Sequence, residues 1–370
     1  MIKVLHCYKT YYPDTFGGIE QVIYQLAEGG SNHNISSTVF THTPKKAGVS
    51  ELDNHYCVRS HTSFEIASTP FSFSSFQTFR ELAQKADIIH YHFPYPFMDV
   101  LHFSLSNKKP SVLSYHSDIV KQKALLKLYA PLMNSFLKSV DCIIAASPNY
   151  VESSPTLQRF KNKVEVIPYG LNKEFYHNND PLVIERWRAR FPNGFFLFVG
   201  TFRYYKGLHI LIEAAKNSTY PIVVIGAGPI EAELKAQAKQ LGVDNIYFLG
   251  ALEDSEKSAL LELCTCLVFP SHLRSEAFGI SLLEGALYAK PLISSEIGTG
   301  TTYINIDRVT GLVVPPSNPR ALRVAMDEIW DNPEQAKILG KAAQDRFETL
   351  FTADKMVDSY SKLYKSLLNM

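Results

Sequence analysis

The chain has 370 residues, which is enough for two domains of ordinary size. Its hydrophobic fraction of 46% and charged fraction of 20% are those of a soluble globular protein. The formal net charge of only +1 argues against nucleic acid as a partner, because a nucleic-acid-binding domain usually carries a strong basic field.

Five cysteines stand at positions 7, 57, 142, 264 and 266, and their odd number does not suit a disulfide framework. Cys7, Cys142 and Cys266 lie in or beside apolar runs, which indicates buried thiols in a reducing compartment. Cys264 and Cys266 have no second pair at metal-ligand spacing, so no zinc site is expected there.

The start of the chain, Ile2–Cys7, reads as a first strand rather than a signal peptide. No run approaches the roughly 18 apolar residues of a membrane-spanning helix. The expected location is therefore the cytoplasm, and a peripheral contact with the cytoplasmic face of the inner membrane stays open.

Short apolar runs alternate with helical patterns along the whole chain. In the first half, the expected strands are Ile2–Cys7, Thr38–His42, Tyr56–Ser60, Ile88–His92, Val112–His116, Cys142–Ala146 and Val164–Pro168. In the second half, they are Phe195–Gly200, Ile222–Gly226, Ile246–Gly250, Cys266–Pro270, Leu292–Ser295 and Leu312–Val314. Many of these are continuous apolar runs, which are typical of parallel strands buried on both faces. Such strands, separated by helix-length segments, predict doubly wound α/β sheets.

Turn and linker signals interrupt this alternation after Gly170, in Asn178-Asn179-Asp180-Pro181 and Pro192-Asn193-Gly194. We therefore predict an N-terminal α/β domain over residues 1–172 and a C-terminal α/β domain over residues 173–352. The final segment, residues 353–370, has a helical pattern, and the sequence leaves open whether it crosses back to the first domain.

Ligands of open α/β sheets bind beyond the carboxyl ends of the strands, and the unusual residues of this chain cluster at those ends. They are the pair Gly17 and Gly18 after the first strand, His90, His92 and His116 at the ends of two others, Arg203 and Lys206 after Gly200, and Glu276 after Pro270. Because each predicted domain presents such an edge, we expect a ligand held in the cleft between them.

Glu276 and Glu284 flank Gly279, and Ile280–Ala289 has a helical pattern. A helix that starts near Gly279 offers free amides and the positive end of its dipole to a diphosphate. Glu284, about one turn into this helix, is placed to accept hydrogen bonds from ribose hydroxyls, and Glu276 is placed to accept them from a sugar. The spacing alone fits a surface loop and a solvated helix carboxylate equally well, so that alternative stays open.

Arg203 and Lys206 lie in a loop before a helix expected from Gly207 to about Lys216. An arginine fork and a lysine ammonium can together neutralise a diphosphate, including the nucleoside diphosphate that leaves a donor. On this segment alone, a pair of solvated charges is the alternative.

Paired glycines, Gly17 and Gly18, stand between the first strand and a helix expected over Ile19–Glu28. Such a pair lets the backbone approach a ligand closely, although a tight turn without a ligand would also use it.

His116 ends an apolar strand and is placed to contact a sugar hydroxyl, with a structural role as the alternative. His90 and His92 would share one face of a strand, but no third metal ligand at suggestive spacing appears. The chain also has no Asp-x-Asp pair. A bound metal is therefore not expected, and Arg203 and Lys206 would have to hold a diphosphate in its place.

Gly226 and Gly228 follow a strand and open a helix, as a dinucleotide fingerprint does. Glu231, however, stands where that fingerprint requires Gly or Ala. We interpret the segment as a turn near the nucleotide and not as a nicotinamide site.

A leucine-rich helix expected over Ile119–Ser139 combines basic residues with aromatic residues from an upstream Ser/Pro-rich stretch, a pattern that suits an anionic membrane surface and a lipid-linked acceptor. An ordinary half-buried helix is the alternative. The residues are Lys121, Lys123, Lys127 and Lys138, with Phe64, Phe71, Phe73, Phe76 and Phe79 upstream.

Together these segments resemble the retaining glycosyltransferases of family four, which have the GT-B fold, over nearly the whole chain. Several are similar to a narrower group, the bacterial O-antigen and polysaccharide mannosyltransferases that use GDP-mannose. The most specific stretches are Gly17–Glu20, Tyr115–Val120, Ser147–Ser154, Val166–Gly170, Arg203–Gly207, Arg274–Gly279 and Glu296–Gly300.

The resemblance implies two doubly wound Rossmann-like domains that face each other across a cleft, and metal-independent hexosyl transfer without a cofactor. The donor would be a nucleotide sugar, preferentially GDP-mannose, and the acceptor a lipid-linked oligosaccharide in O-antigen or exopolysaccharide synthesis. It also implies roles for individual residues: Arg203 and Lys206 at the donor diphosphate, Glu276 and the amides of Phe278, Gly279 and Ile280 at the donor sugar, Glu284 at the ribose, Gly17 and Gly18 near the diphosphate, and His116 beside the sugar.

One departure from the family pattern is Thr201, since many members place an arginine directly after the equivalent of Gly200. Arg203 matches the narrower group instead. A UDP-sugar-dependent transferase of the same fold is the first alternative. A nicotinamide-dependent dehydrogenase and a non-catalytic sugar-nucleotide-binding protein are less favoured.

Overall fold

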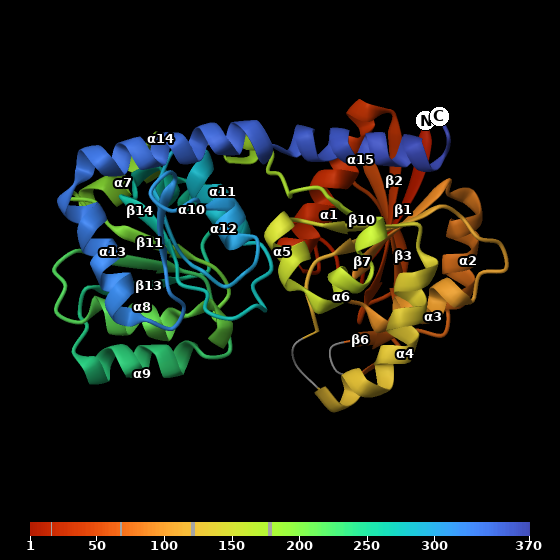
Figure 1. The fold of residues 1–370 in the computed structure, drawn as a ribbon, viewed down its shortest axis with the longest axis horizontal. Helices are drawn as coiled ribbons and strands as arrows, with labels where there is room; N and C mark the ends of the chain where they lie inside the picture. Colours follow the sequence, from red (N-terminus) through yellow and green to blue (C-terminus); the bar gives the residue numbers. More distant parts are fainter. Residues whose placement is uncertain (16, 67–68, 120–122, 177–179) are drawn as a thin grey trace. The chain divides into compact units, whose positions relative to one another are not determined.

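The computed structural model describes residues 1–15, 17–66, 69–119, 123–176 and 180–370 (Figure 1). The chain divides into two compact units. The first unit consists of Met1–Gly170 together with Ala353–Met370, and the second consists of Leu171–Thr352.

The first unit is built on an eight-stranded sheet in the order β10-β9-β8-β7-β1-β2-β4-β3, in which only the pairing of β3 with β4 is antiparallel. The central strands β7 and β8 are buried along their whole length, as their continuous apolar sequences predict. The strands are β1 (Ile2–Cys7), β2 (Ile35–Thr43), β3 (Gly48–Glu51), β4 (His55–His61), β7 (Ile88–Phe93), β8 (Ser111–Tyr115), β9 (Cys142–Ala145) and β10 (Val164–Val166).

Helices cover both faces of this sheet, and Figure 1 shows α1 and α2 on opposite sides of its strands. The terminal helix α15 (Ala353–Leu367) packs on α1 so closely that a Cβ on Gly29 would lie 2.9 Å from the Cγ2 atom of Val357. The other elements are α1 (Gly18–Gly29), η1 (Gly30–His33), α2 (Ser75–Lys85), α3 (Pro96–Phe103), α4 (Lys123–Ser139), α5 (Pro148–Ser153), α6 (Pro155–Arg159), η2 (Lys161–Lys163) and the hairpin β5 (Phe64–Ile66) with β6 (Thr69–Phe71).

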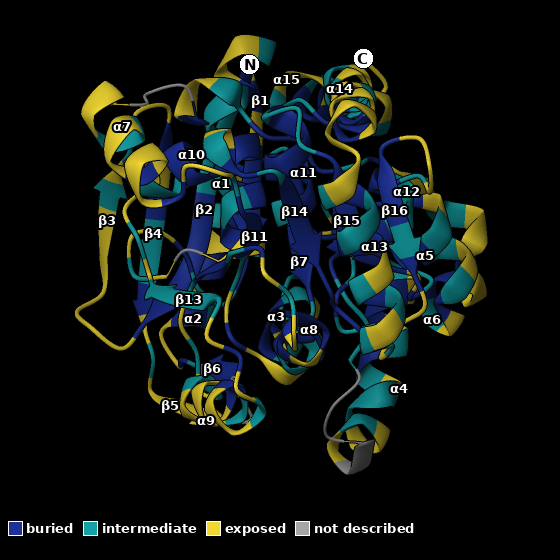
Figure 2. Cartoon of the chain, turned by 90° about the vertical axis from the view of Figure 1, so that its left-hand side faces the viewer, coloured by how far each residue is buried: buried dark blue, intermediate teal, exposed yellow. Residues whose placement is uncertain are grey.

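The second unit is built on a six-stranded, fully parallel sheet in the order β13-β12-β11-β14-β15-β16. Figure 2 shows β11 and β14 buried, whereas β13 at one edge is only partly covered. The strands are β11 (Phe196–Val199), β12 (Ile222–Ile225), β13 (Ile246–Gly250), β14 (Cys266–Phe269), β15 (Leu292–Ser295) and β16 (Gly311–Val314).

Helices cover both faces of the second sheet as well; Figure 1 shows α8 and α9 on one side of the strands and α11 and α14 on the other. They are η3 (Lys173–Tyr176), α7 (Pro181–Arg190), η4 (Tyr204–Lys206), α8 (Leu208–Ala215), α9 (Glu231–Leu241), α10 (Asp254–Leu263), α11 (Ile280–Leu287), α12 (Thr301–Ile304), α13 (Pro319–Asp331) and α14 (Pro333–Leu350).

Every strand expected from the sequence has a counterpart within two or three residues, and the α/β doubly wound class is confirmed. All five cysteines are buried free thiols, as expected. No helix of the described residues is long and apolar enough to span a membrane. The expected helix Ile119–Ser139 begins at Lys123 in the structure; Phe16, Lys121 and the linker residues Asn178 and Asn179 lie outside the described residues.

Candidate active site

The loop after β11 places Lys206 at the carboxyl edge of the second sheet. It forms the short helix η4, and Gly207 then takes a left-handed conformation (φ 74°) before α8 begins. A Cβ at Gly207 would lie 2.0 Å from the carbonyl oxygen of Pro270, at the end of β14. Glycine at this position therefore allows the β11 and β14 loops to touch.

This close approach brings Lys206 onto Glu276, and the two side chains form an ion pair. Both are nearly buried, with 13% and 11% of the side chains exposed, and Ser271 Oγ also donates to Glu276 Oε2 at 3.3 Å. Burial opposes the charged form of Lys206, but the carboxylate of Glu276 outweighs it and raises the pKa of the ammonium above its usual value. The site therefore presents a fixed cation beside a fixed carboxylate.

The loop after β15 packs against the segment that contains Glu276. Arg274 Nη1 donates to the carbonyl oxygen of Gly298 at 3.0 Å, and the amide of Gly300 donates to Ala277 at 2.9 Å. A Cβ at Gly300 would lie 2.4 Å from the ring of Phe278, which is buried. The stretch Glu296–Gly300, singled out in the sequence, thus supports the candidate site.

The amino end of α11 follows directly. Gly279 precedes the helix with φ 104°, and no side chain among the described residues caps the first helical amides. Ser281 Oγ donates to the carbonyl oxygen of Val199 at 2.9 Å, which fixes the helix start against the end of β11. Uncapped amides at this position can bind an anion.

Glu284 lies one turn into α11, and its side chain is only 5% exposed. Its Oε1 atom accepts from Tyr176 Oη at 3.0 Å and from Lys257 Nζ at 3.1 Å. Burial disfavours the charge of Lys257, yet Glu284 raises the pKa of this ammonium. Sequence reasoning missed Lys257 and Tyr176, because neither stands in a motif and only the fold brings them to Glu284.

Arg203 is exposed at the start of η4, and no described residue forms a hydrogen bond or ion pair with its guanidinium. Unlike Lys206, it is available to an anion without the loss of a protein contact.

The Gly226 and Gly228 pair has a packing explanation. A Cβ at Gly226 would lie 2.0 Å from the carbonyl oxygen of Gly200, and one at Gly228 would lie 2.4 Å from that of Phe202. The two glycines therefore let the β12 turn lie against the loop that leads to Arg203, in agreement with the interpretation as a turn.

In the first unit, Gly17 and Gly18 are exposed at the amino end of α1, where no side chain in the described part of the chain forms a cap. Glu20 in the first turn is buried and accepts from Thr10 Oγ1 at 2.8 Å and Thr15 Oγ1 at 3.0 Å. These bonds fix the loop and leave the glycine amides at the surface.

His116 follows β8 and is buried, and protein groups occupy both of its ring nitrogens. Nε2 lies 2.9 Å from His92 Nδ1, and Nδ1 lies 2.5 Å from Tyr169 Oη. Burial lowers the pKa of His116 to about 3, so the ring is neutral. In this arrangement, a sugar hydroxyl reaches a His116 nitrogen only by replacing one of these partners.

The fold supplies a third histidine that spacing along the chain did not show. His6 on β1 joins His90 and His92 on β7, with ligand atoms within 4.8 Å of one another. The nitrogens of His90, however, already contact Ser114 Oγ and Tyr364 Oη, each at 2.7 Å. The contacts are those of a hydrogen-bonded cluster.

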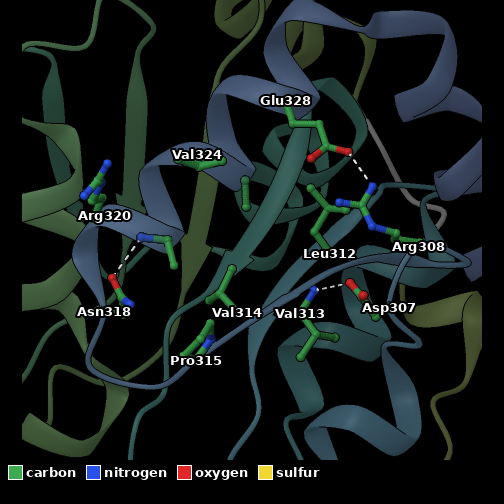
Figure 3. A pocket seen from close by; sticks show the side chains of 12 residues that line it. Asp307, Arg308, Leu312, Val313, Val314, Pro315, Asn318, Arg320, Val324 and Glu328 are labelled. Atoms are coloured by element: carbon green, nitrogen blue, oxygen red, sulfur yellow. Dashed lines mark hydrogen bonds and ion pairs between the residues drawn. The ribbon is translucent and has the colours of Figure 1, made fainter.

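Another hollow, of about 380 Å³, lies between β16 and α13 (Figure 3). It contains an Arg308–Glu328 ion pair at 3.0 Å, and the amide of Val313 donates to Asp307 at 2.9 Å. None of the candidate site residues lines it.

Two protein families match the chain: "Glycosyl transferases group 1" over residues 184–346 and "Glycosyltransferase Family 4" over residues 16–175. The chain is 53% identical over 368 residues to the "O-antigen chain mannosyltransferase C" of Escherichia coli, covering 99% of both proteins. It is 54% identical over 357 residues to the "D-rhamnosyltransferase WbpZ" of Pseudomonas aeruginosa, covering 95% of the chain and 93% of that relative.

Solved structures show the same architecture. Sucrose-phosphate synthase from Thermosynechococcus elongatus has a TM-score of 0.83 at 22% identity, with all of both chains covered. WaaG, described as a glycosyltransferase involved in lipopolysaccharide biosynthesis, has a TM-score of 0.72 at 16% identity, covering 98% of this chain and 99% of WaaG. These neighbours confirm the GT-B fold that the sequence resemblance implied.

Proposed function

Because the chain belongs to the group 1, family four glycosyltransferases, we propose that it transfers mannose from GDP-mannose to a lipid-linked oligosaccharide in O-antigen synthesis. The observation that carries this proposal is the buried Lys206–Glu276 pair beside the uncapped start of α11. It combines a cation for phosphate, a carboxylate for sugar hydroxyls and free amides in one place.

In the proposed donor complex, Lys206 and Arg203 neutralise the diphosphate and stabilise it as it leaves. Glu276 and the amides of Phe278, Gly279 and Ile280 hold the sugar, and Glu284 accepts from the ribose. The exposed amides of Gly17 and Gly18 offer a further contact for the diphosphate.

The proposed transfer retains the anomeric configuration and needs no metal. The acceptor hydroxyl attacks the anomeric carbon on the face that the diphosphate leaves, and the leaving phosphate oxygen takes its proton. We expect NMR of the product to show the donor's anomeric configuration, and EDTA to leave turnover unchanged. An inverted product or loss of activity in EDTA contradicts the respective part of the mechanism.

The acceptor assignment is supported by a largely apolar groove of about 410 Å³ in the first unit. Among the described residues that line it, Lys9 alone carries a charge, and Leu125 and Leu128 of α4 form part of its wall. Lys9, Pro94 and Ile119 follow β1, β7 and β8, so the groove opens at the carboxyl edge of the sheet, where ligands of such folds bind.

This combination suits an amphipathic acceptor with an apolar chain and a phosphate. Leu128 is 81% exposed and Phe73 is 76% exposed, which agrees with peripheral contact at a membrane surface, whereas Phe79 belongs to the core. Initial rates with the same oligosaccharide on a lipid diphosphate and on a short water-soluble aglycone test the assignment. Equal kcat/KM for both contradicts it.

The donor sugar is the least determined part, since the mannosyl and D-rhamnosyl relatives are equally similar. D-rhamnose is 6-deoxymannose, so the two donors differ by one hydroxyl. Transfer from GDP-mannose, GDP-D-rhamnose and a set of UDP-sugars, measured side by side, separates them. We expect GDP-mannose to give the highest kcat/KM; turnover of UDP-sugars alone contradicts the donor assignment.

Glu276→Gln tests the site itself, because it keeps the size of the side chain but removes the charge. We expect kcat/KM to fall about 100-fold or more. Glu328→Gln, at the remote ion pair with Arg308, is the matched control and should keep the wild-type rate. Full activity of Glu276→Gln contradicts the proposed site.

A further inference from the structure

Three histidines of the first unit are hydrogen-bonded to one another in a row. His6 Nδ1 lies 3.2 Å from His92 Nε2, and His92 Nδ1 lies 2.9 Å from His116 Nε2. The row ends at His116 Nδ1, which contacts Tyr169 Oη at 2.5 Å. All three rings are buried, with at most 4% exposed.

The parallel sheet produces this row. β1, β7 and β8 are neighbours, and the register places His6 opposite His90 and His92 opposite Ser114. Each histidine of the row therefore stands two residues beyond the one on the preceding strand, on the same face of the sheet. The row steps across the strands toward their carboxyl ends and finishes at His116.

A neutral imidazole has one N–H group and one nitrogen that accepts. If Tyr169 donates to His116, then His116 and His92 each donate through Nε2 to the next ring, His6 accepts through Nδ1, and all three are Nε2–H tautomers. If His6 donates to His92 through Nδ1, the direction reverses and all three are Nδ1–H tautomers. The observed hydrogen bonds thus permit two states, and in both the three rings share one tautomer.

Two other buried histidines of this unit, His90 and His42, lack such a constraint. His90 and His42 each have both nitrogens at hydroxyl groups, which rotate to suit either tautomer. A change of tautomer in His6, His92 or His116, by contrast, requires protons to shift in all three rings. Imidazole partners therefore make the row a cooperative unit.

We propose that His6 and His92 are positioning residues of the transfer reaction, which couple the tautomer of His116 to their own through this row of hydrogen-bonded rings, the histidine relay. The proposal rests on the proposed function and on the position beside the donor sugar that the family resemblance implies for His116. The relay uses one His116 nitrogen and leaves the other at a hydroxyl, the kind of group that a sugar presents. A sugar hydroxyl in the place of Tyr169 would meet a nitrogen whose donor or acceptor character is already set.

Activity of folded variants tests the positioning role. We expect His92→Leu to lower kcat about tenfold while KM for the nucleotide sugar stays within about twofold, because the diphosphate contacts lie elsewhere. His6→Leu should lower kcat several-fold, and His6→Asn should restore much of it, since the amide keeps a hydrogen-bonding atom near the Nδ1 position. His42→Asn, a buried histidine outside the relay, should lose thermal stability and keep its kcat.

NMR of the full chain labelled with ¹⁵N-histidine tests the relay independently of any substrate. The ring signals of His6, His92 and His116, assigned from the variants, should report one common neutral tautomer. Different tautomers among the three rings, or a charged ring at pH 7, overturn the relay. Wild-type kcat in folded His92→Leu, or an equal loss in His42→Asn, overturns the positioning role. Failure of the donor assignment shows instead as absent transfer by the wild-type protein with the expected NMR pattern intact.

Discussion

The two units share a doubly wound architecture, and each places its unusual residues at the carboxyl edge of a parallel sheet, yet the chemistry at the two edges is opposite. In the second unit, Lys206 and Lys257 are held charged by Glu276 and Glu284. In the first unit, burial keeps a row of histidines neutral. A buried charge needs a partner, whereas a neutral ring needs only hydrogen bonds. This difference supports the proposal that the second edge binds a charged ligand and the first binds hydroxyl groups.

The largest expected effect comes from removing the charge of Lys206. Lys206→Met should lower kcat/KM about 1000-fold, because the diphosphate loses a preorganised cation as it leaves. It should also lower the free energy of unfolding by about 3 kcal/mol, because the carboxylate of Glu276 remains buried without a countercharge. Steady-state kinetics and urea unfolding measure the two effects.

The double variant Lys206→Met/Glu276→Gln separates them. It removes both charges, so most of the lost stability should return while the rate stays low. Recovery of the rate together with the stability would mean that the pair serves the fold alone.

Because the buried histidines of the first unit are neutral, we expect the stability of the fold to decrease in acid. Burial lowers the pKa of His6 and of His116 to about 3, whereas both titrate near 6.5 in the unfolded chain. Between these values, the unfolded chain binds protons that the folded chain does not, so the free energy of unfolding falls as the pH drops below 6.5. Between pH 7 and pH 5, each of these two rings should lower the free energy of unfolding by about 2 kcal/mol. Urea unfolding at the two pH values checks this; His6→Leu should show the smaller drop.

Removing the charge of Glu284 should have a smaller effect, on KM and not on kcat. We expect Glu284→Gln to raise KM for the nucleotide sugar about tenfold with little change in kcat, because a ribose contact is made equally in the ground state and the transition state. A donor with a deoxyribose provides the control. This donor should bind the wild-type protein more weakly than the ribose donor does, whereas the Glu284→Gln variant should bind both donors equally. If the losses of affinity from the variant and from the deoxyribose add up, Glu284 does not contact the ribose.

The strands were predictable because a parallel strand buried on both faces is a continuous apolar run. The ends of such runs lie within one residue of the ends of β7, β12 and β14. The structure also contains β3 and the β5–β6 hairpin, where no strand was expected. The β3 segment, Gly48–Glu51, was missed because it is an exposed edge strand with a single large apolar residue. Edge strands leave little hydrophobic signal in a sequence.

The candidate site was predictable only in its local parts. Lys206 and Glu276 stood in recognisable loops, and the structure brings them together. Tyr176 and Lys257 at Glu284, and His6 at His92, depend on strand order and helix packing across long stretches of chain. Strand order is not written in the spacing of residues along a sequence, so these partners became visible only in the folded chain.

The smallest effect is expected for the exposed Arg308–Glu328 ion pair, which serves as a comparison for the buried Lys206–Glu276 pair. Arg308 and Glu328 form an ion pair at 3.0 Å, and the Lys206–Glu276 pair likewise joins a basic side chain to a carboxylate. In the Arg308–Glu328 pair, however, 69% and 37% of the side chains are exposed. Water screens such a pair, and the entropy of ordering two long side chains offsets most of the attraction. Arg308→Ala should therefore change the free energy of unfolding by less than about 0.5 kcal/mol and leave kcat/KM unchanged. A loss as large as that of Lys206→Met in either measurement would show that burial is not what distinguishes the two pairs.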